Sequence, residues 1–335
     1  MALPSTIRTL RQPEPLKQQV ILTTAPLPTL TPGSTTEHLI RVHATSPCKN
    51  ELRWPQFAPD SMAKEIVPCY DLSGTVVIAP ADSPFPAGTE VWGRTDASHS
   101  GNAREYTISY TSELALRPKS IDPITAASVP LSAITAVQSL FDHGGLARLD
   151  AGEEGRKANA SKRILIIAAS GSVGIWLVQL AREAGVGGIV GVCGTKNVDF
   201  VRQLGATDVI DYTEQSIKQW IDADPTSNRK VDLVIDCQGG ESLAQAWYTV
   251  KDHGTLLSIC EPTEPRKPKD CGVEDVKNYF FIMAPRGEDL GDVSRLLEEG
   301  KVRTLVDSVF KIEEYEKVFE RVEGGKARGK VLITL

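Results

Sequence analysis

The sequence lacks the cysteine spacing of a small metal or redox site. Six cysteines are present, and no two of them are separated by only two residues. A structural zinc site and a thioredoxin-type disulfide both depend on such C-x-x-C pairs. The cysteine pattern therefore excludes both.

The chain also lacks long apolar runs and an excess of basic charge. No run reaches the ~18 apolar residues of a membrane-spanning helix. Lys plus Arg number 37 and Asp plus Glu number 43, for a net charge of −6. Residues 1–15 are polar and hold three prolines, unlike the apolar core of a signal peptide. We therefore expect no nucleic-acid partner, no membrane partner and a cytoplasmic location.

A chain of 335 residues with 41% hydrophobic residues is long enough for two domains. The first 130 residues hold short alternating runs that are interrupted by Pro and Gly, as in an irregular β-rich domain. Helix formers follow over 122–141, where Asp122-Pro123 resembles a helix cap and first turn. The polar segment 148–162 is expected to be a solvated loop.

Strands and helices alternate after residue 162. The strands are apolar along their whole length, as parallel strands are when helices cover both faces of the sheet. Beyond residue 270 the alternation of strands and helices is less regular. The last elements are expected to rejoin the first domain. The expected strands are 163–169, 188–193, 208–211, 231–237, 255–260, 279–283, 306–310 and a final one, and the expected helices are 173–184, 198–204, 241–250, 290–299 and 315–322.

The strongest local signal is a glycine-rich turn between the strand at 163–169 and the following helix. Ala168, Gly171 and Gly174 form A-x-x-G-x-x-G, a shifted form of the dinucleotide-binding pattern. Such a turn directs backbone N–H groups at a pyrophosphate, and its glycines permit close approach. The alternative is plain strand-turn-helix packing. The predicted phosphate-binding residues are Ala168, Ser170, Gly171, Ser172, Val173 and Gly174.

The segment after the second strand of this domain predicts which nicotinamide cofactor is bound. NAD enzymes generally place an acidic residue there, which holds the ribose 2′-hydroxyl. Here the segment is Gly194-Thr195-Lys196, which offers a hydroxyl and a positive charge to a 2′-phosphate. Tyr212, after the third strand, adds a phenol. The sequence thus predicts NADPH, the alternative being that Lys196 is an ordinary lysine in the first turn of a helix.

Several segments together resemble the medium-chain dehydrogenase/reductase superfamily, in its quinone oxidoreductase and enoyl reductase branches. They are the glycine turn and residues 130–136, 140–145, 204–212 and 325–331. The resemblance implies an α/β protein in which a GroES-like β-barrel domain precedes a Rossmann doubly wound parallel-sheet domain. It places the GroES-like domain at 1–130, completed by 275–335, and the NADP(H)-binding Rossmann domain at 131–274. It also implies an active site in a cleft between the domains.

The sequence departs from the zinc-dependent members of this superfamily. Cys48 falls where their first ligand lies, but their Gly-His-Glu is here Cys69-Tyr70-Asp71. A phenol is not a usual zinc ligand, so we expect no metal. A catalytic zinc held by Cys48, Cys69 and either His99 or Asp96 stays open as an alternative.

Without a metal, the accessible chemistry is hydride delivery to an acceptor that is already electrophilic. Quinones and α,β-unsaturated carbonyl compounds qualify, and the developing enolate then needs a hydrogen-bond donor. The resemblance places Lys49, Asn50 and Tyr70 on one wall of the cleft as donors. It places Thr135 and Ser258 on the cofactor side. The alternatives are a solvated Lys49, a turn at Asn50 and a packed Tyr70 ring.

The sequence favours an NADPH-dependent reductase of small quinones or enones and leaves two other functions open. One is a trans-acting enoyl reductase that serves a carrier domain of a polyketide synthase. The other is a redox-inactive NADPH-binding protein. A homodimer is also open, because relatives of this type often form dimers.

Overall fold

The computed structural model of the chain describes residues 3–224, 226 and 228–335, and these residues divide into two units. One unit combines the N-terminal segment up to Ile134 with Ala284–Leu335, and the other is Thr135–Met283. None of the helices in the described ranges is both long and apolar enough to cross a membrane.

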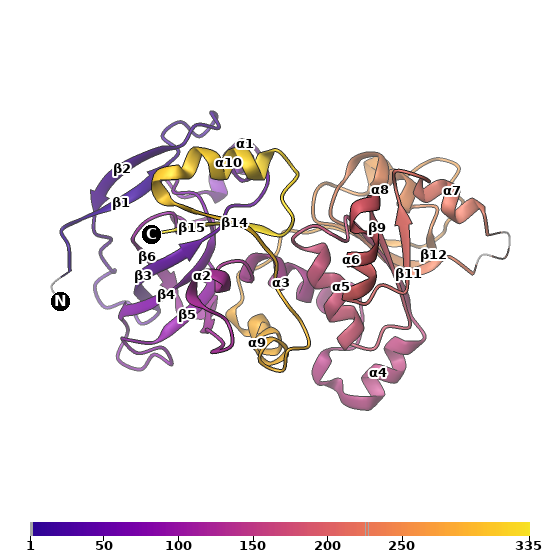
Figure 1. Cartoon of the computed structure of the whole chain (residues 1–335), viewed down its shortest axis with the longest axis horizontal. Coiled ribbons are helices and arrows are strands. Elements are labelled where there is room, and N and C mark those ends of the chain that lie inside the picture. The colour runs from indigo at the N-terminus through magenta and orange to yellow at the C-terminus, as the bar shows by residue number, and fades with distance from the viewer. Residues whose placement is uncertain (1–2, 225, 227) are drawn as a thin grey trace. The chain divides into compact units, whose positions relative to one another are not determined.

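The second unit is a doubly wound α/β domain. Its six strands follow the order β10-β9-β8-β11-β12-β13, and every neighbouring pair is parallel (Figure 1). The strand order reverses between β8 and β11, as in the Rossmann fold. This confirms the predicted fold class. The elements are β8 (Arg163–Ile167), β9 (Gly188–Cys193), β10 (Asp208–Asp211), β11 (Val231–Asp236), β12 (Val250–Ser258), β13 (Lys277–Phe280), α4 (Gly152–Ala160), α5 (Gly174–Glu183), α6 (Val198–Leu204), α7 (Ile217–Asp222) and α8 (Gly240–Ala246).

Helices cover both faces of this sheet, which explains why its strands are apolar along their whole length. Leu165 and Ile167 of β8 belong to a buried core with Trp220 of α7 and Leu243 of α8. On the other face, a Cβ at Gly191 of β9 would lie 2.7 Å from the Val201 side chain of α6. The strands therefore have no solvent-facing side on which polar residues would alternate.

The other unit is built on a mainly antiparallel seven-stranded sheet. The path of this sheet is β14-β15-β3-β4-β5-β7, with β6 paired to β3, and β1 and β2 form a separate ribbon. Its elements are β1 (Thr6–Arg11), β2 (Ile21–Pro26), β3 (Glu37–Thr45), β4 (Asp71–Ile78), β5 (Glu90–Arg94), β6 (Tyr106–Tyr110), β7 (Leu114–Leu116), β14 (Val306–Lys311), β15 (Lys330–Thr334), α1 (Trp54–Phe57), α2 (Pro123–Ala126), α3 (Pro130–Val137, which crosses the unit boundary), α9 (Leu290–Glu298) and α10 (Tyr315–Glu323).

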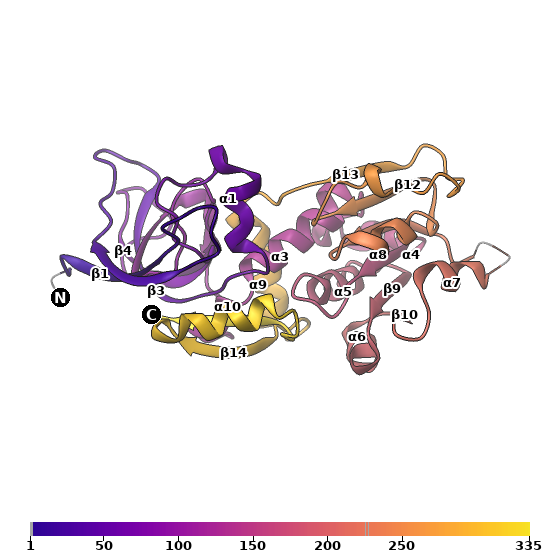
Figure 2. The same ribbon diagram turned by 90° about the horizontal axis from the view of Figure 1, so that it is seen from above.

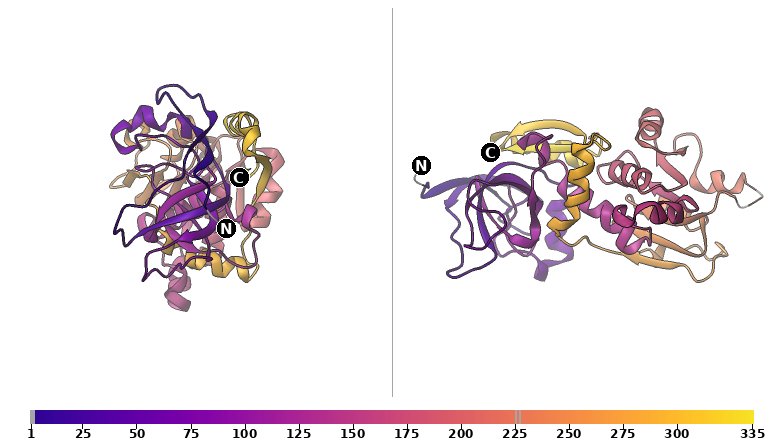
Figure 3. Two further views of the ribbon diagram at one scale, coloured as in Figure 1. Left: turned by 90° about the vertical axis from the view of Figure 1, so that its left-hand side faces the viewer. Right: turned by 90° about the horizontal axis from the view of Figure 1, so that it is seen from below.

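The C-terminal end of the chain completes this sheet. β15 pairs antiparallel with β3, where Ile333 faces Thr45, and parallel with β14. Figure 2 shows α10 beside β14, and both views of Figure 3 show this yellow segment with the indigo N-terminal strands. The unit is therefore discontinuous in sequence.

One expectation about these helices was wrong, and another was confirmed. Residues 148–162 are not a solvated loop, since they contain α4, whose Asn159 is buried and bonds to Ala147 and to the Ala184 carbonyl. Residues 122–141 are largely helical, and Asp122 caps the first helix, as expected, by accepting hydrogen bonds from the N–H groups of Ile124 and Thr125. This segment is divided into α2, α3 and a π-helical turn over Gln138–His143, and the break precedes Pro130, which has no N–H to continue a helix.

Candidate functional site

The predicted phosphate turn joins β8 to α5. Ala168 has φ +59°, a left-handed conformation that costs a residue with a side chain roughly 1–2 kcal/mol. The Gly171 N–H donates to the Ala168 carbonyl at 2.9 Å, and the Ile175 N–H donates to the Gly171 carbonyl at 3.0 Å. Ser170, Ser172 and Val173 lie inside this turn, directly before α5. The first N–H groups of a helix have no partner within it, so this turn can bind an anion.

Gly174 allows α5 to lie against β8. A Cβ there would be 2.3 Å from the Ala168 carbonyl oxygen and 2.7 Å from the Ala169 main chain. Gly171 has more room, because its nearest contact would be 3.1 Å, again to the Ala168 oxygen. The two glycines thus differ in role. The missing side chain at Gly174 lets the helix pack closely against the turn, whereas that at Gly171 leaves space for a ligand to approach the main chain.

The segment predicted to bind the 2′-phosphate follows β9. Thr195 and Lys196 are exposed, and Tyr212, which follows the neighbouring β10, is 65% exposed. A Cβ at Gly194 would lie 3.0 Å from the Tyr212 hydroxyl. The structure therefore brings all four predicted residues to one edge of the sheet.

A carboxylate that the sequence reasoning missed lies under this segment. Asp211 accepts hydrogen bonds from the N–H and the hydroxyl of Thr213, and the Thr213 hydroxyl is 2.6 Å from that of Thr195. Burial opposes ionisation, but hydrogen bonds from Thr195 and Thr213 hold the pKa of Asp211 below its usual value. Since Asp211 is the last residue of the third strand, β10, the absence of an acid after the second strand gives no indication of it.

Thr135 and Ser258, predicted on the cofactor side, are both buried. The Ser258 hydroxyl donates to Asp236 at 2.8 Å and accepts from the N–H groups of Cys260 and Glu261. The Thr135 carbonyl accepts from the Ser139 hydroxyl at 2.7 Å. Ser258 is therefore part of an internal hydrogen-bond network at the carboxyl end of β12.

The predicted proton donor, Tyr70, is only 1% exposed. Its ring stacks on Trp54 at 5.5 Å, and the Arg94 guanidinium lies 5.6 Å from the ring centre. Among the described residues its hydroxyl has no hydrogen-bond partner. Burial, and then the charge of Glu51, raises the pKa of Tyr70 far above its usual value, so the phenol keeps its proton at neutral pH.

The other two predicted donors lie against the C-terminal segment. Asn50 has φ +64°, and its N–H donates to a Glu323 carboxylate oxygen at 2.8 Å. A Cβ at Gly325 would lie 3.2 Å from the Lys49 ammonium. Both side chains are exposed, and the backbone of Asn50 has the turn conformation that the alternative interpretation describes.

Glu51, which the sequence reasoning also missed, joins the two loops that carry these residues. Its carboxylate accepts from the Cys48 N–H at 3.0 Å and from the Cys69 N–H at 2.6 Å. Burial raises the pKa of Glu51 to about 7. No sequence motif marks it, because its two partners belong to different loops.

The residues at this place do not fit a zinc ion. Burial raises the pKa of the Cys48 and Cys69 thiols well above the usual value, which disfavours the thiolate that binds zinc. Asp71 forms a buried ion pair with Lys330 at 2.8 Å, and His99 Nε2 lies 2.8 Å from Glu113. Nowhere in the described ranges do three His, Cys, Asp or Glu side chains gather as a metal site requires.

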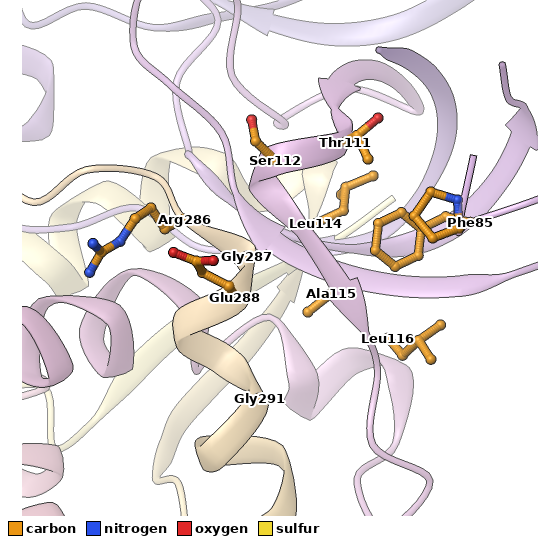
Figure 4. A pocket seen from close by; sticks show the side chains of 11 residues that line it. Phe85, Thr111, Ser112, Leu114, Ala115, Leu116, Arg286, Gly287, Glu288 and Gly291 are labelled. Carbon is orange, nitrogen blue, oxygen red and sulfur yellow. The ribbon is translucent and has the colours of Figure 1, made fainter. Parts of the chain in front are cut away.

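A hollow of about 490 Å³ lies in the first unit, and its lining includes none of the predicted site residues. Figure 4 shows Phe85 and Leu114 on one side of it and Arg286 and Glu288 on the other. Arg286 is already paired with Asp289 at 2.8 Å. The hollow therefore shows no group of titratable side chains that would suggest catalysis.

Comparison with known proteins places the chain among oxidoreductases. The zinc-binding dehydrogenase family model matches residues 204–333. A probable zinc-binding oxidoreductase, mitochondrial, of Arthroderma benhamiae is 45% identical over 333 residues, 99% of this chain and 98% of that protein. The mitochondrial NAD(P)H oxidoreductase RTN4IP1 of Danio rerio is 29% identical over 79% of this chain and 71% of that protein. A chloroplast envelope quinone oxidoreductase homolog of Arabidopsis thaliana is 28% identical over 80% and 79%.

A solved structure shares the fold over almost the whole chain. The quinone oxidoreductase from Coxiella burnetii superposes with a TM-score of 0.81 at 22% identity, covering 98% of this chain and 99% of that one. Together with the relatives, this confirms the mixed α/β fold with a Rossmann sheet and a separate sheet domain. The chain is an oxidoreductase, and a relative named for NAD(P)H implies a nicotinamide cofactor.

The expectation of a cytoplasmic location is contradicted by these relatives. The Arthroderma benhamiae protein, at 45% identity, and RTN4IP1 are both named mitochondrial. A search for an apolar leader detects secretory signals, whereas mitochondrial leaders are amphipathic and basic. The absence of an apolar core in residues 1–15 therefore does not distinguish a cytoplasmic protein from a mitochondrial one.

Proposed function

We propose that this chain, which belongs to the medium-chain dehydrogenase/reductase superfamily, is an NADPH-dependent reductase of quinones or α,β-unsaturated carbonyl compounds. The observation that carries the NADPH preference is the segment Gly194-Thr195-Lys196 beside Tyr212, in which Thr195 and Lys196 are exposed. Within the described ranges, the carboxylate of Asp211 adjoins this segment and accepts hydrogen bonds from threonines. A 2′-phosphate finds hydroxyl groups and a cation here, whereas the acidic residue that NAD enzymes generally place after the second strand to hold the ribose 2′-hydroxyl is replaced by Gly194-Thr195-Lys196.

Different residues bind the cofactor and supply the proton. The turn from Ala168 to Gly174 holds the pyrophosphate at the N-terminus of α5. The 2′-phosphate is held by Thr195, Lys196 and Tyr212. When bound, the dihydronicotinamide supplies a hydride. Tyr70 keeps a proton on a buried hydroxyl that has no described partner, and it offers this proton to the oxygen of the acceptor.

Acceptors that are already electrophilic match a site whose residues do not fit zinc. In quinones and enones the carbonyl group withdraws charge from the carbon that accepts hydride. A panel of free quinones, free enones and carrier-bound thioesters tests this choice. NADPH oxidation with the free acceptors supports it, and turnover with the thioesters alone identifies a carrier-dependent enoyl reductase instead. Tight NADPH binding without oxidation on any acceptor would show a redox-inactive protein.

Lys196→Glu tests the cofactor assignment. Replacing the cation by an anion removes a charged hydrogen bond to the 2′-phosphate, so the affinity for NADPH should fall by about 1–3 kcal/mol, or roughly 5- to 150-fold. The affinity for NADH should not fall. Calorimetric titration of both cofactors measures this, and Lys157→Glu, an exposed change on α4, is the matched control. If the unaltered protein binds NADH as tightly as NADPH, the assignment of Lys196 is wrong.

A further inference from the structure

We propose that Asp236 is a positioning residue for the nicotinamide half of the cofactor, holding two loops together where that half binds. Asp236 is the last residue of β11 and is fully buried. The inference rests on the proposed function, since it assumes that the second unit binds a dinucleotide.

The Asp236 carboxylate accepts hydrogen bonds from two different loops. From its own loop, the Gln238 N–H donates at 3.1 Å, and the Gly239 N–H lies 3.0 and 2.9 Å from the two oxygens. From the end of β12, the Ser258 hydroxyl donates at 2.8 Å. Ser258 extends this anchor, because its oxygen accepts from the N–H groups of Cys260 and Glu261 at 3.1 and 3.3 Å.

Glu261 connects the same two loops a second time. It accepts from the Gly240 N–H and is paired with Arg266 at 3.0 Å. Gly239 has φ +77°, and a Cβ there would lie 2.8 Å from a Glu261 oxygen. Residues 237–240 and 259–261 are thus held at close range, with a glycine where they meet.

The position of these loops in the sheet points to the ligand. They follow β11 and β12, and the strand order reverses between β8 and β11, where open parallel sheets bind ligands beyond their carboxyl ends. The 2′-phosphate segment follows β9 and β10 on the other side of β8. A dinucleotide whose pyrophosphate lies on the turn after β8 therefore extends its nicotinamide half toward the loops after β11 and β12.

A buried carboxylate with this many donors is suited to keeping loop geometry fixed. Burial raises the pKa of Asp236, while the donors from Gly239 and Ser258 favour the ionised form. Asp236→Asn preserves the side-chain volume but replaces one acceptor oxygen by an N–H donor. Some of the N–H and hydroxyl donors of the two loops then lose their hydrogen-bond acceptor, and a buried donor without an acceptor costs free energy.

The experiment compares a whole cofactor with half of one. Adenosine 2′,5′-bisphosphate carries the 2′-phosphate and lacks the nicotinamide. In Asp236→Asn the dissociation constant of NADPH should rise by about tenfold or more, as expected for a lost hydrogen bond to a charged group, while that of adenosine 2′,5′-bisphosphate stays within roughly twofold. The matched control is Asp232→Asn on the same strand, where the carboxylate bonds to the Arg163 N–H and to Lys251 at the opposite end of β11. It should leave both constants unchanged.

Ser258→Ala provides a second test that keeps the carboxylate. It removes the hydroxyl that links the loops and should weaken NADPH binding selectively, by about threefold or more, even if Asp236→Asn fails to fold. Equal weakening of both ligands, or of neither, in a folded variant would overturn the inference while the proposed function stands. Failure of the unaltered protein to bind NADPH would overturn both.

Discussion

The contact between α5 and β8 makes Gly174→Ala a sharp test of the phosphate turn. The added methyl would lie 2.3 Å from the Ala168 oxygen, about 0.7 Å closer than the 3.0 Å that real Cβ contacts respect. The contacted atoms are main-chain atoms of a turn that follows a buried strand, so they cannot rotate away. Forcing an extra methyl into such a site typically costs about 1–3 kcal/mol.

The expected displacement has two measurable effects. Helix α5 moves from the sheet, which lowers the melting temperature by a few degrees. Its first N–H groups move with it, so NADPH binding should weaken by about tenfold or more. Differential scanning calorimetry and titration calorimetry measure the two effects on the same preparation.

Gly171→Ala is the matched control, because the two glycines lie in the same turn. The nearest atom to its methyl would be the Ala168 oxygen at 3.1 Å, compared with 2.3 Å at Gly174, and the φ of Gly171 is not positive. Its melting temperature should therefore stay near that of the unaltered protein, although a methyl that faces the pyrophosphate lowers affinity. A Gly174→Ala protein with unaltered melting temperature and NADPH affinity would refute the close-packing argument.

Two further predictions concern the first unit. Burial raises the pKa of Glu51 from 4.5 to about 7, so the folded state holds this proton more tightly than the unfolded state. The resulting stability is present below pH ~4.5 and is lost as the pH rises through ~7, about 3 kcal/mol in all. Urea unfolding at pH 5 and pH 8 should show this loss and Glu51→Gln should not; parallel pH dependence in both proteins would contradict the assignment. Tyr70→Phe should lower turnover by roughly 10²–10⁴-fold with NADPH affinity unchanged, since one general acid is lost. Its melting temperature should not fall, because the lost hydroxyl has no described partner, and unchanged turnover on the best acceptor would exclude Tyr70 as the proton donor.

The second unit was largely predictable from the sequence because its signals are local. The expected strand 188–193, helix 198–204 and strand 208–211 have the bounds of β9, α6 and β10. Each is an apolar or periodic run with a glycine or a short polar turn beside it. The helix α4 was missed because its residues are mostly exposed, and its anchor, Asn159, bonds to segments on either side.

The residues that organise the candidate site were not predictable in the same way. Glu51 accepts a hydrogen bond from the Cys69 N–H, Asp71 forms an ion pair with Lys330, and Asp236 accepts a hydrogen bond from the Ser258 hydroxyl. Each of these pairs is formed by the fold between residues far apart in the sequence. Spacing along the chain carries no signal for such a pair, whereas the glycine turn has all its parts within a few residues.

The C-terminal completion of the first unit sets an order in which the protein can mature during synthesis. Residues 135–283 are synthesised before Lys330, so the second unit can fold before the first unit is complete. The N-terminal segment has to wait for β15, because Asp71 is buried against Lys330, and an unpaired buried carboxylate costs several kcal/mol. A chain that is cut before Lys330 would therefore contain every residue of the second unit, but its first unit would lack β15 and the partner of Asp71.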